Sequence, residues 1–202
     1  MRSGRLAELR HTPPLLVAQK ILRRIPFTPV DVGRLCFLRL DRAPRVPPAL
    51  LRGPGIVRHA TLADIDALAI LRKQRSMFLE RFANGDAGVV AEIDGRVVGC
   101  EWFCASETHD ETGWGYRIAV PPGFVYAYDA FIDPQYRNSG IWLRFKAHLG
   151  DWMRKSGKSG VLTFVDYGNW PSLRTHLRFG FRPDTEVLVL KIMGKLFSRA
   201  SS

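Results

Sequence analysis

Long apolar runs are absent from this sequence of 202 residues. No stretch approaches the roughly 20 apolar residues that a membrane-spanning helix requires, and Leu15-Leu-Val-Ala18 is too short for the core of a secretory signal peptide. Cysteine is scarce, with only Cys36, Cys100 and Cys104. This small, odd number argues against a disulfide framework. We therefore expect a cytoplasmic protein.

Clusters of metal ligands are missing as well. Cys100 and Cys104 share one face of a predicted strand, but the other ligands that a metal would need are lacking around them. We expect no metal site and interpret the cysteines as small hydrophobic residues of the core. With 46% hydrophobic residues, the chain can bury one substantial core.

Acidic residues are few at the start of the chain, and this makes the charge uneven. Residues 1–52 contain 11 basic and three acidic residues, so they carry +8 of the net charge of +11. Prolines and glycines are frequent in residues 42–54, which indicates a linker. We therefore predict a basic N-terminal extension over residues 1–52 and a single domain over residues 53–202.

The extension contains one amphipathic helix. Leu15, Ala18, Leu22 and Ile25 fall on one helical face, with basic residues elsewhere on the helix, before Pro26 interrupts it. Such a helix suits an anionic membrane surface or an acidic protein partner. Alternatively, its apolar face packs on the main domain and its charges are solvated. Nucleic acid is an improbable partner, because no aromatic or groove-reading pattern accompanies the basic residues.

The rest of the chain alternates between strand and helix patterns. Asp94-Gly95 joins two β-rich runs and predicts a two-residue hairpin, and Thr61 with Asp64 predicts a helix N-cap. We expect a polar loop over residues 108–115. The expected strands are 32–40, 55–60, 89–93, 96–104, 124–132, 160–165 and 185–193, and the expected helices begin near 62, 76, 140 and 170.

One stretch predicts an anion site. Asp129-Ala-Phe-Ile-Asp-Pro-Gln-Tyr-Arg-Asn-Ser-Gly-Ile-Trp142 is an apolar run that stops at a proline turn and restarts as a helix. The first turn of a helix has backbone N–H groups without partners and the positive end of the helix dipole. Small or polar residues there let a phosphate approach these amides directly. The stretch can therefore hold a phosphorylated cofactor by its backbone.

Two motifs resemble the GNAT superfamily of CoA-dependent N-acyltransferases. Ile132-Asp-Pro-Gln-Tyr-Arg-Asn-Ser-Gly-Ile-Trp142 is similar to the family pattern V-x-P-x-x-R-G-x-G-[IL]-[GA]. Asn169-Trp-Pro-Ser-Leu-Arg-Thr-His-Leu-Arg-Phe-Gly-Phe181 is similar to N-x-x-[AS]-x-x-x-Y-x-x-x-G-F. The resemblance extends over roughly residues 55–193. It implies an α+β fold with a mixed, mostly antiparallel central sheet flanked by helices.

The resemblance also implies an acetyl-CoA or acyl-CoA site. Backbone groups of Phe131 and Ile132 would pair with the pantetheine arm, and Asn169 would bond the same arm with Ser172 close by. The amides that would hold the pyrophosphate belong to Arg137, Asn138, Ser139, Gly140, Ile141 and Trp142. Asn138 stands where the family usually has glycine, and Trp142 stands where glycine or alanine is usual. Trp142 could turn away, stack on the cofactor or crowd the phosphates.

The catalytic candidates are three side chains. Asp129 is a charge in an apolar strand and is our first candidate for the base that deprotonates an amine; Glu101 is the second. The alternative for either is a salt bridge to an arginine. His176 stands where the family often has a tyrosine that protonates the leaving thiolate, and imidazole can serve as that acid; otherwise it is a histidine satisfied by a neighbour.

Strand alternation predicts that Asp129 and Tyr128 point to opposite faces, so that they do not enter the same cleft. Tyr126 and Tyr128 are further candidates for the wall of a substrate cleft. The resulting interpretation is an enzyme that moves an acetyl or acyl group from a thioester to a small-molecule or peptide amine. An acyl carrier protein, docked by the basic extension, is the alternative donor, and a non-catalytic GNAT-like binding module is the second alternative. The identity of the acceptor and the oligomeric state do not follow from the residues.

Overall fold

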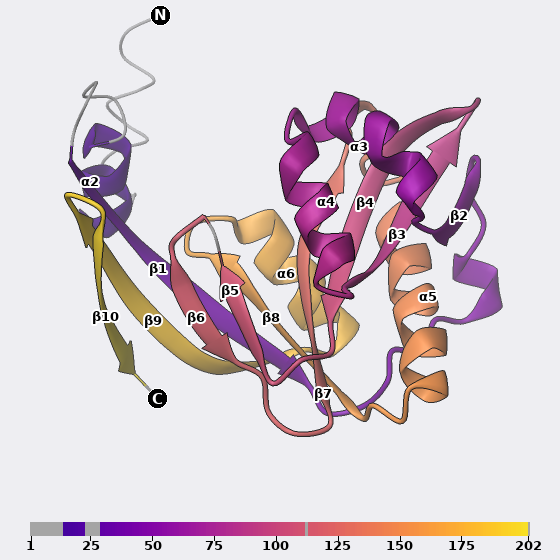
Figure 1. Cartoon of the computed structure of the whole chain (residues 1–202). Helices are drawn as coiled ribbons and strands as arrows, with labels where there is room; N and C mark the ends of the chain where they lie inside the picture. Colours follow the sequence, from indigo (N-terminus) through magenta and orange to yellow (C-terminus); the bar gives the residue numbers. More distant parts are fainter. Residues whose placement is uncertain (1–13, 23–28, 112, 202) are drawn as a thin grey trace, which may run out of the picture. The chain divides into compact units, whose positions relative to one another are not determined.

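The computed structural model of the chain describes residues 14–22, 29–111 and 113–201 (Figure 1). These residues form two compact units. Unit 1 takes in the described residues up to Arg39, Asp110–Ile118 and the chain from Phe164 onward, and unit 2 takes in Leu40–His109 and Ala119–Thr163. The predicted boundary between residues 52 and 53 stays a prediction.

Unit 2 is built on a mixed sheet in the order β8-β7-β4-β3-β2. The strands are β2 (Ile56–His59), β3 (Ala87–Ile93), β4 (Arg96–Cys104), β7 (Phe124–Ile132) and β8 (Gly160–Asp166), whose last residues belong to unit 1. Neighbours are antiparallel except for β7 and β8, which are parallel. The predicted α+β fold with a mixed, mostly antiparallel sheet is confirmed.

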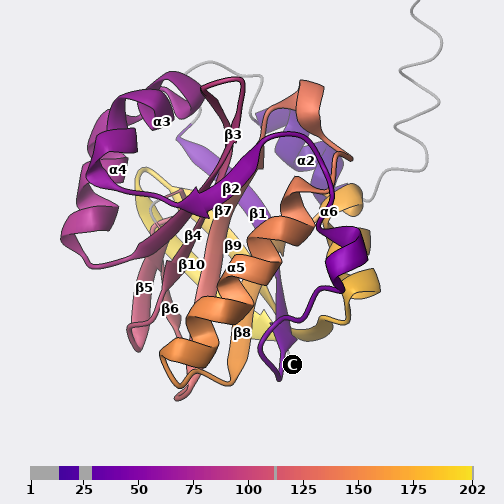
Figure 2. The ribbon, with the colours of Figure 1, turned by 90° about the vertical axis from the view of Figure 1, so that its right-hand side faces the viewer.

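Helices cover both faces of this sheet. The helices are α3 (Ile65–Arg72), α4 (Arg75–Ala83) and α5 (Ile141–Lys155), with short 3-10 turns at Pro48–Leu50, Leu62–Asp64 and Pro134–Tyr136. Trp102 of β4 contacts Phe78 of α4, whereas its neighbour Glu101 contacts Lys146 of α5. Because adjacent strand residues point to opposite faces, α4 and α5 lie on opposite sides of the sheet, as Figure 2 also shows.

The predicted local signals in unit 2 are confirmed. Asp94 and Gly95 both have positive φ (50° and 72°), as a two-residue hairpin turn requires. Thr61 N–H donates to Asp64 Oδ2 at 2.8 Å at the start of the helical segment. Cys100 and Cys104 are buried in the core as expected. Burial raises the pKa of the Cys100 thiol to about 12, so this residue is an inert core thiol.

Unit 1 contains three antiparallel strands in the order β10-β9-β1, in which β9 and β10 form a hairpin and β1 comes from the start of the chain. Its elements are α2 (Pro14–Leu22), β1 (Val30–Leu40), α6 (Trp170–Phe179), β9 (Arg182–Ile192) and β10 (Lys195–Ser201). Ile25 and Pro26, expected at the end of the N-terminal helix, lie outside the described residues. No helix in the described part of the chain is long and apolar enough to cross a membrane.

Two expectations about the elements are wrong. The expected polar loop over residues 108–115 contains β5 (Thr108–Glu111), which forms a two-stranded sheet with β6 (Tyr116–Ala119). β10 was not expected at all. Both segments are rich in polar residues, and β-propensity depends on context because cross-strand neighbours supply most of the stabilisation. Here, Phe197 of β10 lies opposite Leu190 of β9.

His148 makes the stability of unit 2 sensitive to acid. Its ring packs edge-on against His59 of β2 at 5.6 Å, and burial, followed by His59, holds the pKa of His148 below its ordinary value of 6.5. A lowered pKa means that the unfolded chain binds the proton more readily. The contribution of this group to stability is therefore present above pH 6.5 and is lost as the pH falls through the lowered pKa.

We expect His148→Phe to flatten this dependence. Urea denaturation from neutral pH to about pH 5 measures the free energy of unfolding of both proteins. The wild type should lose more stability than His148→Phe over this interval, and parallel curves would contradict the assignment.

Candidate active site

A bulge distorts β7 at Asp129. In the pairing with β4, Phe131 lies opposite Cys100 and Tyr128 lies opposite Trp102, so β7 has one more residue than β4 in this interval. Asp129 has a φ of 47°, in the left-handed region. Such a residue breaks the alternation of side chains along the strand.

The bulge brings Tyr128 and Asp129 to the same face. Arg81 Nη1 donates to Asp129 Oδ2 at 2.7 Å, and the Cζ atom of the same guanidinium lies 4.9 Å from the centre of the Tyr128 ring. The expectation that these two side chains point to opposite faces is therefore wrong. The physical reason is the extra residue, since alternation holds only for regular strands.

Two arginines hold the Asp129 carboxylate. Arg72 Nη2 donates to Oδ1 at 2.8 Å from α3, and Arg81 donates to Oδ2 from α4. The Arg81 side chain is 11% exposed and that of Asp129 is 17% exposed. The salt-bridged alternative for Asp129 is thus present in the structure. The arrangement keeps one hydrogen bond on each oxygen, and each oxygen has a second lone pair.

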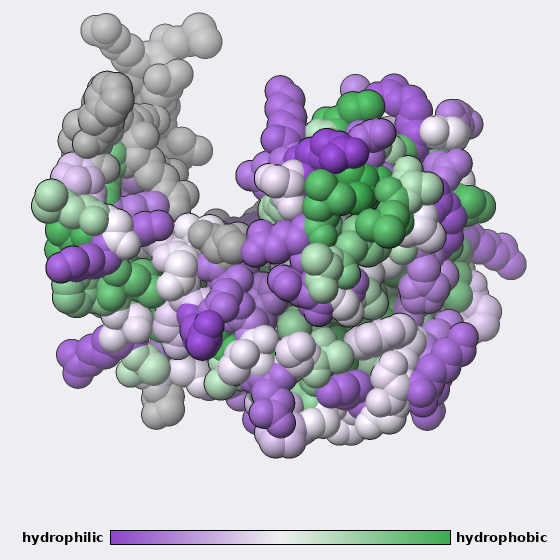
Figure 3. Space-filling model, viewed as in Figure 1, coloured by the Kyte–Doolittle hydropathy of each residue, from purple (hydrophilic) through white to green (hydrophobic). Residues whose placement is uncertain are grey.

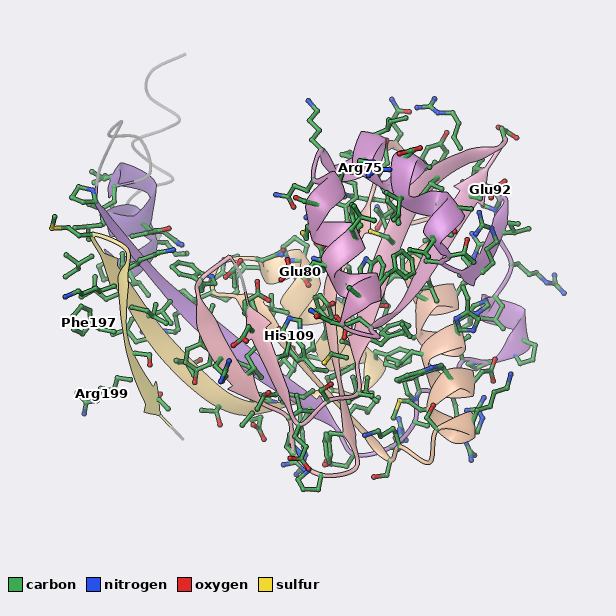
Figure 4. All side chains as sticks on the ribbon, viewed as in Figure 1. Arg75, Glu80, Glu92, His109, Phe197 and Arg199 are labelled. Carbon is green, nitrogen blue, oxygen red and sulfur yellow. The ribbon has the colours of Figure 1, made fainter. Side chains whose placement is uncertain are left out.

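A second polar cluster lies on the same face. Tyr128 Oη donates to Asp86 Oδ2 at 2.5 Å, and burial, together with this carboxylate, raises the pKa of Tyr128 above its usual range. His109 lies 4.2 Å from the Tyr128 ring and 4.8 Å from the Tyr126 ring, measured between ring centres (Figure 4). A carboxylate, a phenol and an imidazole therefore gather beside the Asp129 group.

Glu101 lies on the opposite face of the sheet. Its carboxylate pairs with Lys146 Nζ, and the two residues are 2% and 0% exposed. Among the described residues, no hydrogen-bond partner reaches Glu101 Oε2. Burial raises the pKa of Glu101, and the neighbouring ammonium opposes that rise. Glu101 and Asp129 therefore do not serve the same acceptor, because they point away from each other.

The turn between β7 and α5 has the backbone of an anion-binding loop. Asn138 and Gly140 both have positive φ (67° and 81°). Asparagine is the residue that tolerates this conformation best after glycine, which accounts for Asn138 where the family usually has glycine. No side chain in the described parts of the chain caps the start of α5, whose N-cap is Gly140. The first amides of this 15-residue helix therefore have no side-chain acceptor.

Two side chains of the turn donate hydrogen bonds to nearby backbone carbonyls. Ser139 Oγ donates to the Tyr136 carbonyl at 2.6 Å, and Arg137 Nε donates to the Ile132 carbonyl at 3.3 Å. The ring centre of Trp142 lies 4.9 Å from Nζ of Lys146, one helical turn further along α5.

Arg144 braces the turn from one helical turn further on. It donates to the Pro54 carbonyl at 2.7 Å and to the Gly55 carbonyl at 3.1 Å. A Cβ on Gly53 would lie 2.7 Å from the Ser139 carbonyl, so this close approach requires glycine. The proline-rich segment is thus fixed against the loop.

The remaining predicted site residues lie in unit 1. Asn169 Oδ1 accepts a hydrogen bond from the Ser172 amide at 3.4 Å and caps α6. His176 is 6% exposed, its Nδ1 lies 2.9 Å from the Ser172 carbonyl, and its ring packs edge-on against Phe181. Because a carbonyl only accepts, Nδ1 carries the proton of this hydrogen bond.

Sequence reasoning missed several residues around these groups. They are Arg72, Arg81, Asp86, His109, Arg144 and Lys146. Their partners lie tens of residues away along the chain, so no local spacing marks them. The one available signal was the unpaired charge of Asp129 in an apolar strand, which implied a basic partner without identifying it.

Comparisons with known proteins show the family and the fold. Residues 60–181 match the acetyltransferase (GNAT) family. A functionally unknown protein from Staphylococcus epidermidis is similar in structure, with a TM-score of 0.56 and 13% identity, over 90% of this chain and 68% of that one. A protein described as a GNAT acetyltransferase from Novosphingobium aromaticivorans has a TM-score of 0.56 and 14% identity, over 79% of this chain and 63% of that one.

An aminoglycoside N-acetyltransferase in complex with CoA has a TM-score of 0.53 and 19% identity, over 63% of this chain and 91% of that one. At these identities the likeness shows the fold alone. No curated protein sequence matches the chain significantly.

Proposed function

We propose that this chain, which belongs to the GNAT acetyltransferase family, transfers an acetyl or short acyl group from a CoA thioester to an amine. The observation that carries the proposal is the start of α5. Shortly after the bulged strand β7, Gly140 has a left-handed backbone, and no side chain among the described residues caps the first helical amides. This geometry fits the pyrophosphate of CoA.

CoA would bind mainly to the backbone. We propose that amides from Asn138 to Trp142 hold the pyrophosphate, and that Phe131 and Ile132 pair with the pantetheine arm. Asn169 and Ser172 would contact the same arm. The cofactor, when bound, supplies an activated acyl group as a thioester.

Two protons must move during acyl transfer. We propose that Asp129 accepts the proton of the attacking amine, because each of its carboxylate oxygens binds one arginine and keeps a second lone pair. We propose that His176, in its imidazolium form, donates the Nε2 proton to the leaving thiolate and thereby becomes the neutral ring with its proton on Nδ1. Glu101 is enclosed on the other face of the sheet. We propose that Glu101 acts by fixing α5 through Lys146, without touching the acceptor.

The donor is proposed to be CoA itself. The acyl carrier protein hypothesis and the membrane-surface hypothesis both depend on residues 1–52, of which 1–13 and 23–28 lie outside the described residues. They stay predictions. Mixing the purified protein with acetyl-CoA and a panel of primary amines, and measuring the released thiol, tests the proposed reaction. Absence of CoA binding by calorimetry would overturn the proposal.

We expect Gly140→Ala to weaken CoA binding at least tenfold. The positive φ of 81° costs a non-glycine residue about 1–2 kcal/mol, and an added Cβ would lie 3.3 Å from the Arg52 carbonyl. Both effects displace the amides that would hold the pyrophosphate. Calorimetric titration with CoA measures the dissociation constant.

Gly157→Ala is the matched control. Gly157 has a similar φ of 65° and no heavy atom within 4 Å of an added Cβ. This substitution should cause comparable backbone strain without changing CoA affinity. If both variants bind CoA equally well, the turn before α5 is not the phosphate site.

A further inference from the structure

The outer strand of unit 1 has an unpaired edge. β10 ends the strand order of its sheet and pairs on one side only, with β9, from Lys195 opposite Ile192 to Ser201 opposite Glu186. Over its seven residues, the other side meets no strand in the described parts of the chain. An edge of this length offers hydrogen bonds to a further strand.

One face of this hairpin is also apolar. Cross-strand partners share a face of the sheet, so Phe197 lies beside Leu190, and the neighbouring pairs place Leu188 and Ile192 around them. Phe197 is 55% exposed, and Leu188 and Ile192 are exposed as well. Figure 3 shows apolar side chains gathered over the β9–β10 hairpin, and Figure 4 labels Phe197 and Arg199 along β10.

The turn geometry determines which backbone groups are free. Met193 and Gly194 form a two-residue turn with positive φ at both positions (49° and 81°), so the flanking pair Ile192–Lys195 is hydrogen-bonded. Hydrogen-bonded pairs then alternate along the hairpin. Consequently, the N–H and C=O groups of Leu196, Ser198 and Ala200 point to the free edge.

We infer that β10 pairs antiparallel with β10 of a second copy of this chain, centred on Ser198. In this register Ser198 faces Ser198 of the other copy, and Leu196 faces Ala200, so all outward-pointing backbone groups are used. Strands related by a two-fold axis satisfy this arrangement identically in both copies. The pairing also overlaps the strand over its whole length, Lys195–Ser201.

The side chains favour the same register. It places Phe197 of each copy opposite Arg199 of the other, on the apolar face, which permits two cation–π contacts. Lys195 faces Ser201, so no two basic side chains oppose each other. A register centred on Phe197 would place Lys195 opposite Arg199 and would be disfavoured by like-charge repulsion.

Sedimentation equilibrium of the full chain tests the inference. We expect the wild type to be a dimer and Phe197→Arg to be a monomer, because arginine would oppose Arg199 of the other copy. Phe197→Glu should remain a dimer, because glutamate would oppose the same arginine with opposite charge. A monomeric wild type, or a dimeric Phe197→Arg, would overturn the inference. So would dissociation of Phe197→Glu, which is the result that the register centred on Phe197 requires.

A cysteine at the two-fold axis gives an independent measurement. Ser198→Cys should form a disulfide-linked dimer under mild oxidation, because the antiparallel pairing brings the two Cα atoms to about 5.5 Å. Ala200→Cys is the matched control, since it faces Leu196 and not itself. The native cysteines are buried and should stay reduced. Equal cross-linking of both variants, or none of Ser198→Cys, would contradict the register.

Discussion

Replacing Lys146 by methionine is expected to lower the free energy of unfolding by about 3–5 kcal/mol. Lys146 is fully buried and its ammonium pairs with the Glu101 carboxylate, which is almost as deeply buried. Removing the ammonium leaves a carboxylate in an apolar core, and such a charge is costly without a partner. Urea denaturation at neutral pH, followed by tryptophan fluorescence, measures the loss.

The same variant should recover stability in acid. Burial raises the pKa of Glu101, and without Lys146 nothing opposes that rise. A group whose pKa is higher in the folded state stabilises the fold below the unfolded pKa and loses this contribution as the pH rises through the folded pKa. Lys146→Met should therefore be most destabilised at neutral and higher pH, and less so as the carboxyl becomes protonated.

The double variant Glu101→Leu/Lys146→Met is the control. Replacing both members of a buried pair by apolar residues of similar volume is often neutral or stabilising, so this protein should be close to the wild type in stability. A double variant as unstable as Lys146→Met would show that packing around α5, and not the unpaired charge, causes the loss.

Replacing Asp129 by asparagine is expected to lower kcat/KM for acyl transfer by about 10²–10⁴-fold, the usual contribution of a general base. Asparagine has nearly the same shape and accepts one hydrogen bond, but it does not take the proton of the amine. The pH dependence of the rate should also change, since the acid limb that belongs to the base should disappear. Steady-state kinetics over a pH series measures both quantities.

Arg81→Met separates the two roles open to Asp129. This variant removes one of the two ion pairs of the carboxylate but keeps the carboxylate itself. If Asp129 is the base, Arg81→Met should retain more activity than Asp129→Asn, because the carboxylate that accepts the proton is still present. If Asp129 only anchors the arginines, both variants should lose similar activity with unchanged pH profiles, and the proposed role would be wrong.

The two hairpins show how far local sequence determines the fold. Asp94-Gly95 and Met193-Gly194 form turns with similar backbone angles, φ being positive at all four residues. Only the first turn was predicted, because aspartate before glycine tolerates positive φ and methionine does not share this preference. The contacts of β9 and β10 across the sheet hold Met193 in that conformation. The conformation of a turn such as Met193-Gly194 therefore depends on strand pairing between distant segments, which local sequence patterns do not reveal.

The candidate site likewise has features that local sequence predicts and features that depend on distant residues. The uncapped helix start at Gly140 was predictable, since a proline turn, a glycine and helical spacing all lie within a few residues. The surroundings of Asp129 were not, because Arg72 and Arg81 come from two helices distant in sequence. The bulge at Asp129 was also hidden, and it reversed the expected direction of Tyr128 relative to Asp129.

The hydrogen bonds of Arg144 have a thermodynamic consequence for residues 53–55. Arg144 joins the Pro54 and Gly55 carbonyls to α5, and Gly53 packs on the Ser139 carbonyl of the turn before α5. A ligand that orders this loop therefore also orders the segment that leads into β2. Binding of such a ligand should therefore raise the free energy of local unfolding of that segment. Slower amide hydrogen exchange around β2 would then indicate that the ligand is bound. β2 would give this signal although none of the residues proposed to hold the ligand lies on it.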